Sequence, residues 1–94
     1  MPVVVASAPE TSVGISMGAH LAAAIPELAY DCGLATVSLL SSDITTDSLV
    51  AAGGMVDVRR VSPDAALLDR YCADAERRKW WNARLERCLA LLDA

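Results

Sequence analysis

The chain has 94 residues, so it forms one small domain or a part of a larger one. Its apolar fraction of 54% is more than a domain of this size readily buries, which indicates that the chain packs against something else. The net charge is −4, and the six basic and four acidic groups of residues 70–94 give only +2 there, which excludes a nucleic-acid partner.

The three cysteines have no CxxC spacing, which predicts buried thiols in a reducing compartment rather than a disulfide framework or a zinc site. The first residues lack the basic stretch of a signal peptide, and no apolar run is long enough for a membrane span. We therefore expect a cytoplasmic location.

The first expected element is a strand over residues 3–6, because a continuous run of valine and alanine is typical of a buried parallel strand. A helix is expected over residues 13–25, since Thr11 or Ser12 can cap its first turn and Pro26 ends it. Small residues recur at every fourth position of this helix, which predicts that it lies close on a sheet.

A second strand is expected over residues 29–32, closed by Gly33. Strand, helix and strand within about 30 residues predict a right-handed βαβ unit. A short helix over residues 36–40 follows, and residues 49–61 predict an antiparallel hairpin that turns at two adjacent glycines.

Two further helices are expected, over residues 63–71 and 75–92. The spacing of apolar residues in the last helix places five of them on one face: Trp81, Leu85, Cys88, Leu89 and Leu92. We expect the tryptophans to anchor this helix on another surface and the neighbouring basic residues to face water.

The residues alone predict no catalytic group and no metal-ligand set. Nucleotide-binding, zinc-protease and nucleophile-elbow motifs are absent from the sequence. Ser7 ends the first strand without a triad, because the only histidine, His20, lies within the following helix. Five aspartates fall at expected turns, where this residue commonly forms caps and turns: Asp31, Asp43, Asp47, Asp57 and Asp64. To this point the sequence indicates only a soluble α/β piece.

Five stretches carry a resemblance that covers nearly the whole chain. They are VVASAPETSVG (4–14), PELAYDCGLAT (26–36), LLSSDI (39–44), VRRV (58–61) and ERRKWW (76–81). Together they resemble the C-terminal third of the o-succinylbenzoate synthases of the enolase superfamily, and most of all the actinobacterial members.

The resemblance implies a fold and an activity for the complete protein. Members have a capping domain and a modified (β/α) barrel, and they are lyases of menaquinone biosynthesis. They dehydrate 2-succinyl-6-hydroxy-2,4-cyclohexadiene-1-carboxylate to o-succinylbenzoate, using two barrel lysines and a Mg²⁺ ion held by three acidic residues. On this template residues 1–48 hold the last two barrel strands with their helices. Residues 49–94 hold the hairpin and the helices that return to the capping domain.

The resemblance also implies a substrate-binding role for Ser7, because barrel enzymes bind ligands at the C-terminal ends of their strands. Ser7 would bind the carboxylate of the succinyl side chain, with a backbone N–H near Gly33 as the second donor. Two positions depart from the family pattern. Many relatives have a second serine where this chain has Ala6, and Asp31 would repel an anionic substrate if it faced the barrel mouth.

The lysine count limits what this chain does by itself. Lys79 is the only lysine and lies on the terminal helix, so neither barrel lysine is present. By resemblance, the metal carboxylates belong to earlier strands. We therefore expect the 94 residues alone to be inactive and to bind no Mg²⁺. Their expected partners are the remainder of the barrel, the capping domain and a small anionic carboxylate substrate. The isolated chain should then expose apolar surface.

Two other functions remain open at this stage. Another enolase-superfamily enzyme, such as an N-acylamino acid racemase, would share the same scaffold. A non-catalytic α/β module would instead bind a partner through the helix over residues 75–92.

Overall fold

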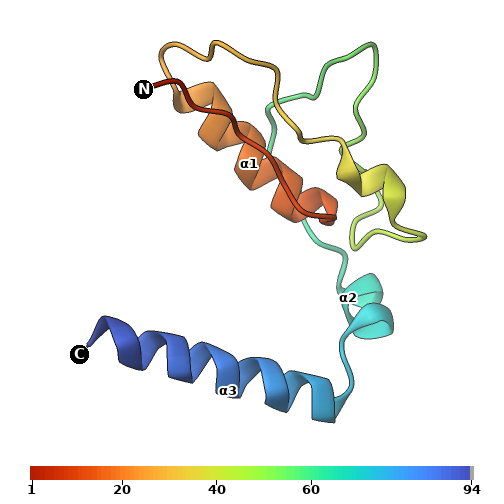
Figure 1. The fold of residues 1–94 in the computed structure, drawn as a ribbon. Helices are drawn as coiled ribbons and strands as arrows, with labels where there is room; N and C mark the ends of the chain where they lie inside the picture. Colours follow the sequence, from red (N-terminus) through yellow and green to blue (C-terminus); the bar gives the residue numbers. More distant parts are fainter. Residues whose placement is uncertain (94) are drawn as a thin grey trace.

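The computed structural model describes residues 1–93, which form three α-helices and one short 3-10 helix. In chain order these are α1 (Ser12–Ala24), η1 (Thr36–Leu39), α2 (Ala65–Tyr71) and α3 (Ala75–Leu92) (Figure 1). Each lies within two residues of a helix expected from the sequence, and α3 has the expected bounds. The helical part of the prediction is therefore confirmed.

The two expected strands are not formed within residues 1–93. Residues 3–6 and 29–32 were expected to pair, but the only link is one parallel bridge between Ala6 and Gly33. Val3 and Val4 are 45% and 56% exposed, so the apolar run is covered on one side only. A lone strand pair is marginal without further strands, and residues 1–93 supply none. The expected α/β sheet is therefore not formed by residues 1–93, which show only the parallel bridge at the ends of the two segments.

The expected hairpin is reduced to its turn. Ala52 and Met55 form an antiparallel bridge, and the two glycines between them have φ angles of +59° and +75°. Both angles lie in the left-handed region, which glycine adopts without a steric penalty. The turn is confirmed, while its flanking residues form no longer ladder within the described part of the chain.

A small core lies between α1, η1 and the two bridged segments. Its buried apolar residues are Val5, Ile15, Ala19, Leu34, Val37 and Leu49. The small residues of α1 do allow a close approach at Gly18, where an added Cβ would lie 2.8 Å from the Leu34 Cδ2 atom, but the neighbour is this side chain and not the expected sheet. Helix α1 therefore contributes Ile15 and Ala19 to the core and packs against segments from residues 5–49.

Helix α3 packs on no other helix within residues 1–93. It starts with an Asp74 cap, whose side chain accepts a hydrogen bond from the Arg77 N–H at 2.7 Å. No residue of α3 is buried, and within residues 1–93 the only two helical elements that pack together are α1 and η1. Figure 1 shows α3 standing apart from α1. Within residues 1–93 the stability of α3 therefore depends on its Asp74 cap and on contacts between neighbouring side chains of the helix.

The predicted apolar face of α3 lacks a covering surface within residues 1–93. Trp81 and Leu85 are 51% and 58% exposed. Trp80 packs edge-on against Trp81 with a centroid separation of 4.8 Å, and the Arg77 guanidinium lies 5.2 Å from the Trp80 ring. The tryptophans therefore contact each other and arginine, and the expected anchoring on another surface is not found here.

We expect removal of residues 73–94 to leave the core intact. Helix α2 would remain tied to it, because the Asp64 N–H donates to the Ile44 carbonyl at 2.8 Å and the Tyr71 and Ser42 hydroxyls lie 2.8 Å apart. The free energy of unfolding should change by less than about 1 kcal/mol, measured by urea denaturation followed by circular dichroism. Removal of residues 1–7, which include buried Val5, is the contrasting control and should abolish the transition. Loss of the transition on removing α3 would contradict this account.

Candidate functional site

Ser7 and Gly33 lie together although they are 26 residues apart. The Ser7 N–H donates to the Gly33 carbonyl at 3.0 Å, and the Ser7 hydroxyl donates to the same oxygen at 3.2 Å. The bridge at Ala6 positions both residues, because it aligns the ends of the two extended segments. The structure therefore brings together the two residues that the sequence selected for substrate binding.

The N–H of Gly33 itself is engaged in this bridge, where it donates to the Val5 carbonyl at 2.9 Å. A Cβ on residue 33 would meet the Ala6 Cβ at 3.2 Å, so glycine permits the close approach of the two segments. The Gly33 N–H is therefore not free to bind an anion beside Ser7, and a second donor would have to be the N–H of a residue next to Gly33.

Thr36 completes the cluster and was not selected from the sequence. Its hydroxyl oxygen lies 3.0 Å from the Ser7 hydroxyl oxygen and donates to the Ala8 carbonyl at 3.0 Å. The available signal was a hydroxyl residue at the start of the short helix, three positions after Gly33. The cluster consists of neutral donors and acceptors, so it can orient an anionic group but has no side chain suited to general acid–base catalysis.

Asp31 does not belong to this cluster. It is exposed and lines an open, mainly apolar groove of about 550 Å³ together with Ala22 of α1 and Met55. Neither Ser7 nor Thr36 lines that groove. Asp31 was expected to repel an anionic substrate if it faced the site. It lies instead in the groove beside α1, which Ser7 and Thr36 do not line.

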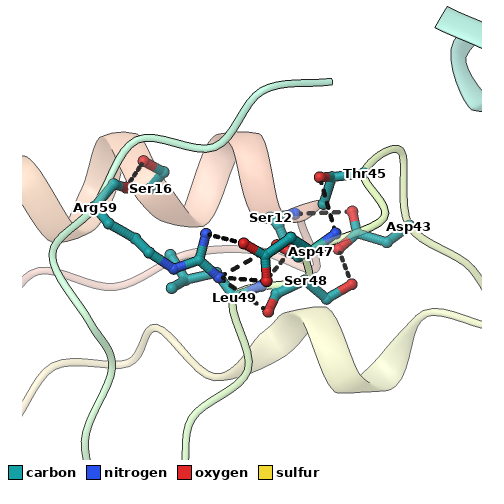
Figure 2. A network of polar contacts seen from close by, with 8 residues as sticks. All are labelled: Ser12, Ser16, Asp43, Thr45, Asp47, Ser48, Leu49 and Arg59. Atoms are coloured by element: carbon teal, nitrogen blue, oxygen red, sulfur yellow. Dashed lines mark hydrogen bonds and ion pairs between the residues drawn. The ribbon is translucent and has the colours of Figure 1, made fainter. Parts of the chain in front are cut away.

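A second polar cluster holds the start of α1 (Figure 2). The Asp43 carboxylate accepts hydrogen bonds from the Ser12 N–H at 3.0 Å, from the Ser12 hydroxyl, from the Ser48 hydroxyl at 2.8 Å and from the Ile44 N–H at 2.8 Å. The fully buried Ser12 hydroxyl also accepts from the Leu49 N–H at 2.8 Å. Asp43 thus satisfies donors at the helix start that Thr11, the residue at the cap position, leaves free.

The hydrogen bonds of Asp43 also change its acidity. Burial disfavours the ionised form, but the two hydrogen bonds from Ser12, with those from Ser48 and Ile44, outweigh it and hold the Asp43 pKa below its ordinary value. The carboxylate is therefore charged at neutral pH and already filled with internal donors, which favours a structural role.

Arg59 extends this cluster on its exposed side (Figure 2). Its guanidinium pairs with the Asp47 carboxylate at 3.2 Å and donates to the Asp47 and Ser48 carbonyls at 3.2 Å. The Ser16 hydroxyl of α1 donates to the Arg59 carbonyl at 2.6 Å. These contacts join three segments that are distant in the sequence. The charged groups of Arg59 and Asp47 pair with each other and do not face a ligand site.

The structure shows no cluster of metal-ligating side chains among the described residues. Within residues 1–93 no three carboxylate, histidine or cysteine side chains come together.

His20 lies on α1, and its Nδ1 atom is 2.7 Å from the Ser16 carbonyl of the preceding turn. Asp64 caps α2 by accepting from the Leu67 N–H at 3.0 Å, as its turn position predicted. No helix of residues 1–93 has the length and apolar character needed to cross a bilayer.

Comparison with known proteins identifies relatives along nearly the whole chain. The o-succinylbenzoate synthase of Thermobifida fusca is 48% identical over 85 residues, which are 90% of this chain and 26% of that protein. The o-succinylbenzoate synthases of Mycobacterium tuberculosis H37Rv and Mycobacterium ulcerans are 41% and 39% identical over 92 residues, which are 98% of this chain and 28% of each protein. No family model matches the chain.

The chain spans little more than a quarter of the length of these curated relatives, and the match lies in their C-terminal segment. The expected resemblance is confirmed by this agreement in both identity and coverage of the chain. The chain is a homologue of the C-terminal segment of the actinobacterial o-succinylbenzoate synthases.

Proposed function

We propose that the chain is the C-terminal part of an o-succinylbenzoate synthase of the enolase superfamily. The complete protein would dehydrate 2-succinyl-6-hydroxy-2,4-cyclohexadiene-1-carboxylate to o-succinylbenzoate in menaquinone biosynthesis. The proposal is supported by the 48% identity to the Thermobifida fusca protein. The structural observation that carries it is the contact between Ser7 and Gly33, at the ends of two parallel segments.

In this proposal residues 3–6 and 29–32 become the seventh and eighth strands of a barrel completed by upstream residues. The parallel bridge supports their neighbouring positions. The exposed side of the first segment would then be covered inside the barrel, and the apolar face of α3 would pack on the capping domain. The uncovered valines and the half-exposed Trp81 support a missing partner, because such surface is costly in water.

Ser7 would bind the succinyl carboxylate of the substrate, with a backbone N–H beside Gly33 as the second donor. A hydrogen bond to a charged group contributes about 1.5–3 kcal/mol, which is enough to orient the substrate. Lys79 is on α3, which packs on no other helix within residues 1–93, and it is 72 residues from Ser7 in the sequence. The proton transfers and any Mg²⁺ chemistry would belong to the upstream part, and this chain would hold the substrate in place.

A fusion protein tests the proposal. It joins the upstream part of the Thermobifida fusca synthase to this chain at the start of the aligned region. We expect it to form o-succinylbenzoate, and we expect Ser7→Ala to raise KM by about 10- to 100-fold with little change in kcat. KM changes because the succinyl carboxylate does not react, so its contact is equally strong in the ground and transition states.

Two controls accompany the fusion protein. The upstream part alone should be inactive, which shows that the chain is needed. Product analysis with N-acylamino acids separates dehydration from racemisation. A folded fusion protein that makes no o-succinylbenzoate would contradict the proposal, and one that only racemises N-acylamino acids would favour the related superfamily enzyme.

A further inference from the structure

The hydroxyl groups of Ser7 and Thr36 share too few protons for their contacts. The Ser7 oxygen lies 3.2 Å from the Gly33 carbonyl and 3.0 Å from the Thr36 hydroxyl oxygen, which is itself 3.0 Å from the Ala8 carbonyl. Each hydroxyl supplies one proton, so two protons serve three contacts. The cluster therefore has more than one hydrogen-bond arrangement.

The Ser7 proton is the one most easily redirected. Its bond to the Gly33 carbonyl is longer than an ordinary O–H···O hydrogen bond, and that carbonyl also accepts the Ser7 N–H at 3.0 Å. Turning the hydroxyl away therefore leaves the carbonyl with a partner. Ala8 is exposed, so water can replace Thr36 at its carbonyl.

From this geometry we propose that Thr36 is a positioning residue, which directs the Ser7 hydroxyl toward a bound carboxylate. The proposal rests on the proposed function, in which Ser7 binds the substrate. Thr36 donates to the Ser7 oxygen, and Ser7 donates to the carboxylate, which is a stronger acceptor than the Gly33 carbonyl. Hydrogen bonds in such a chain polarise and strengthen one another.

The test compares two replacements of Thr36 in the fusion protein described above. Thr36→Val keeps the branched shape and removes the hydroxyl, and we expect KM to rise about 3- to 10-fold with kcat within about twofold. Thr36→Ser keeps the hydroxyl and should stay within about twofold of the parent KM. Ser38→Ala is the matched control, because its hydroxyl lies in the same short helix but donates to the Ala35 carbonyl. It should leave KM unchanged.

A double variant separates positioning from a general structural effect. Thr36 acts through Ser7, so Thr36→Val should add no further increase in KM when Ser7 is already alanine. Melting temperatures of all variants, followed by circular dichroism, report any loss of structure. A further KM increase in the Ser7→Ala background would overturn the proposal, and so would a parent-like KM for Thr36→Val.

These outcomes also separate this proposal from the proposed function. If Ser7→Ala raises KM and Thr36→Val does not, the positioning role fails while the substrate-binding role of Ser7 stands. If Ser7→Ala leaves KM unchanged in an active fusion protein, the proposed carboxylate contact fails, and the positioning role fails with it.

Discussion

Replacing Ile15 with alanine should destabilise the chain by about 2–5 kcal/mol. Ile15 is fully buried, and its side chain lies at the centre of a core with only a few apolar residues. Truncation removes buried apolar surface and leaves a cavity, which neighbouring side chains fill only in part. Total stabilities of domains of this size are about 5–15 kcal/mol, so the loss is a large fraction of what is available.

Urea denaturation followed by circular dichroism measures this effect. Leu21→Ala is the matched control, since Leu21 is on the same helix α1 but is 59% exposed. The control should shift the free energy of unfolding by less than about 0.5 kcal/mol. Equal effects of the two replacements would show that α1 does not bury Ile15 as described.

The helices could be predicted because their signals are local. Asp64 and Asp74 each accept a hydrogen bond from an N–H three residues later, and Pro26 follows the end of α1. Such caps depend on neighbouring residues in the chain and hold whether or not the rest of a protein is present. This is why α3 has its expected bounds while lying on no surface within residues 1–93.

The strands could not be predicted correctly in the same way, because a strand is stable only beside further strands, and residues 1–93 supply none. The valines of residues 3–6 carry the pattern of a strand covered on both faces, yet Val4 is 56% exposed. Residues 1–93 do not cover both faces of this run, and the bridge between Ala6 and Gly33 is the only β pairing that they form there. The same reasoning applies to the exposed apolar face of α3.

The candidate site was predictable in part. The pairing of Ser7 with Gly33 followed from the family resemblance, which places both at strand ends. Thr36 was missed, since its contact with Ser7 spans 29 residues and a lone threonine has no distinctive pattern. The contact of Ser12 with Asp43 spans 31 residues and could not be predicted either, because the sequence indicates for Asp43 only a local cap or turn.

Removing the Asp43 carboxylate should cost about 2–4 kcal/mol at neutral pH. Asp43→Ala leaves the Ser12 N–H and hydroxyl without their acceptor in a buried position, and an unsatisfied buried donor costs about 1–3 kcal/mol. Asp43→Asn retains one acceptor oxygen and should lose less. Asp47→Asn is the control, because the Asp47 side chain is 82% exposed and exposed ion pairs contribute about 0–1 kcal/mol.

The stabilisation by Asp43 should decrease at acidic pH. The folded-state pKa of Asp43 is below its ordinary value, so the folded state binds fewer protons than the unfolded state in this pH range. The stabilisation is therefore fully present above the unfolded pKa of about 4. It is lost as the pH falls through the folded pKa. The stability difference between the parent chain and Asp43→Asn should therefore be constant from pH 7 to about 5 and shrink below about pH 4. Urea midpoints measured at several pH values check this, and a difference that grows with acidity would show that Asp43 is not held ionised by Ser12.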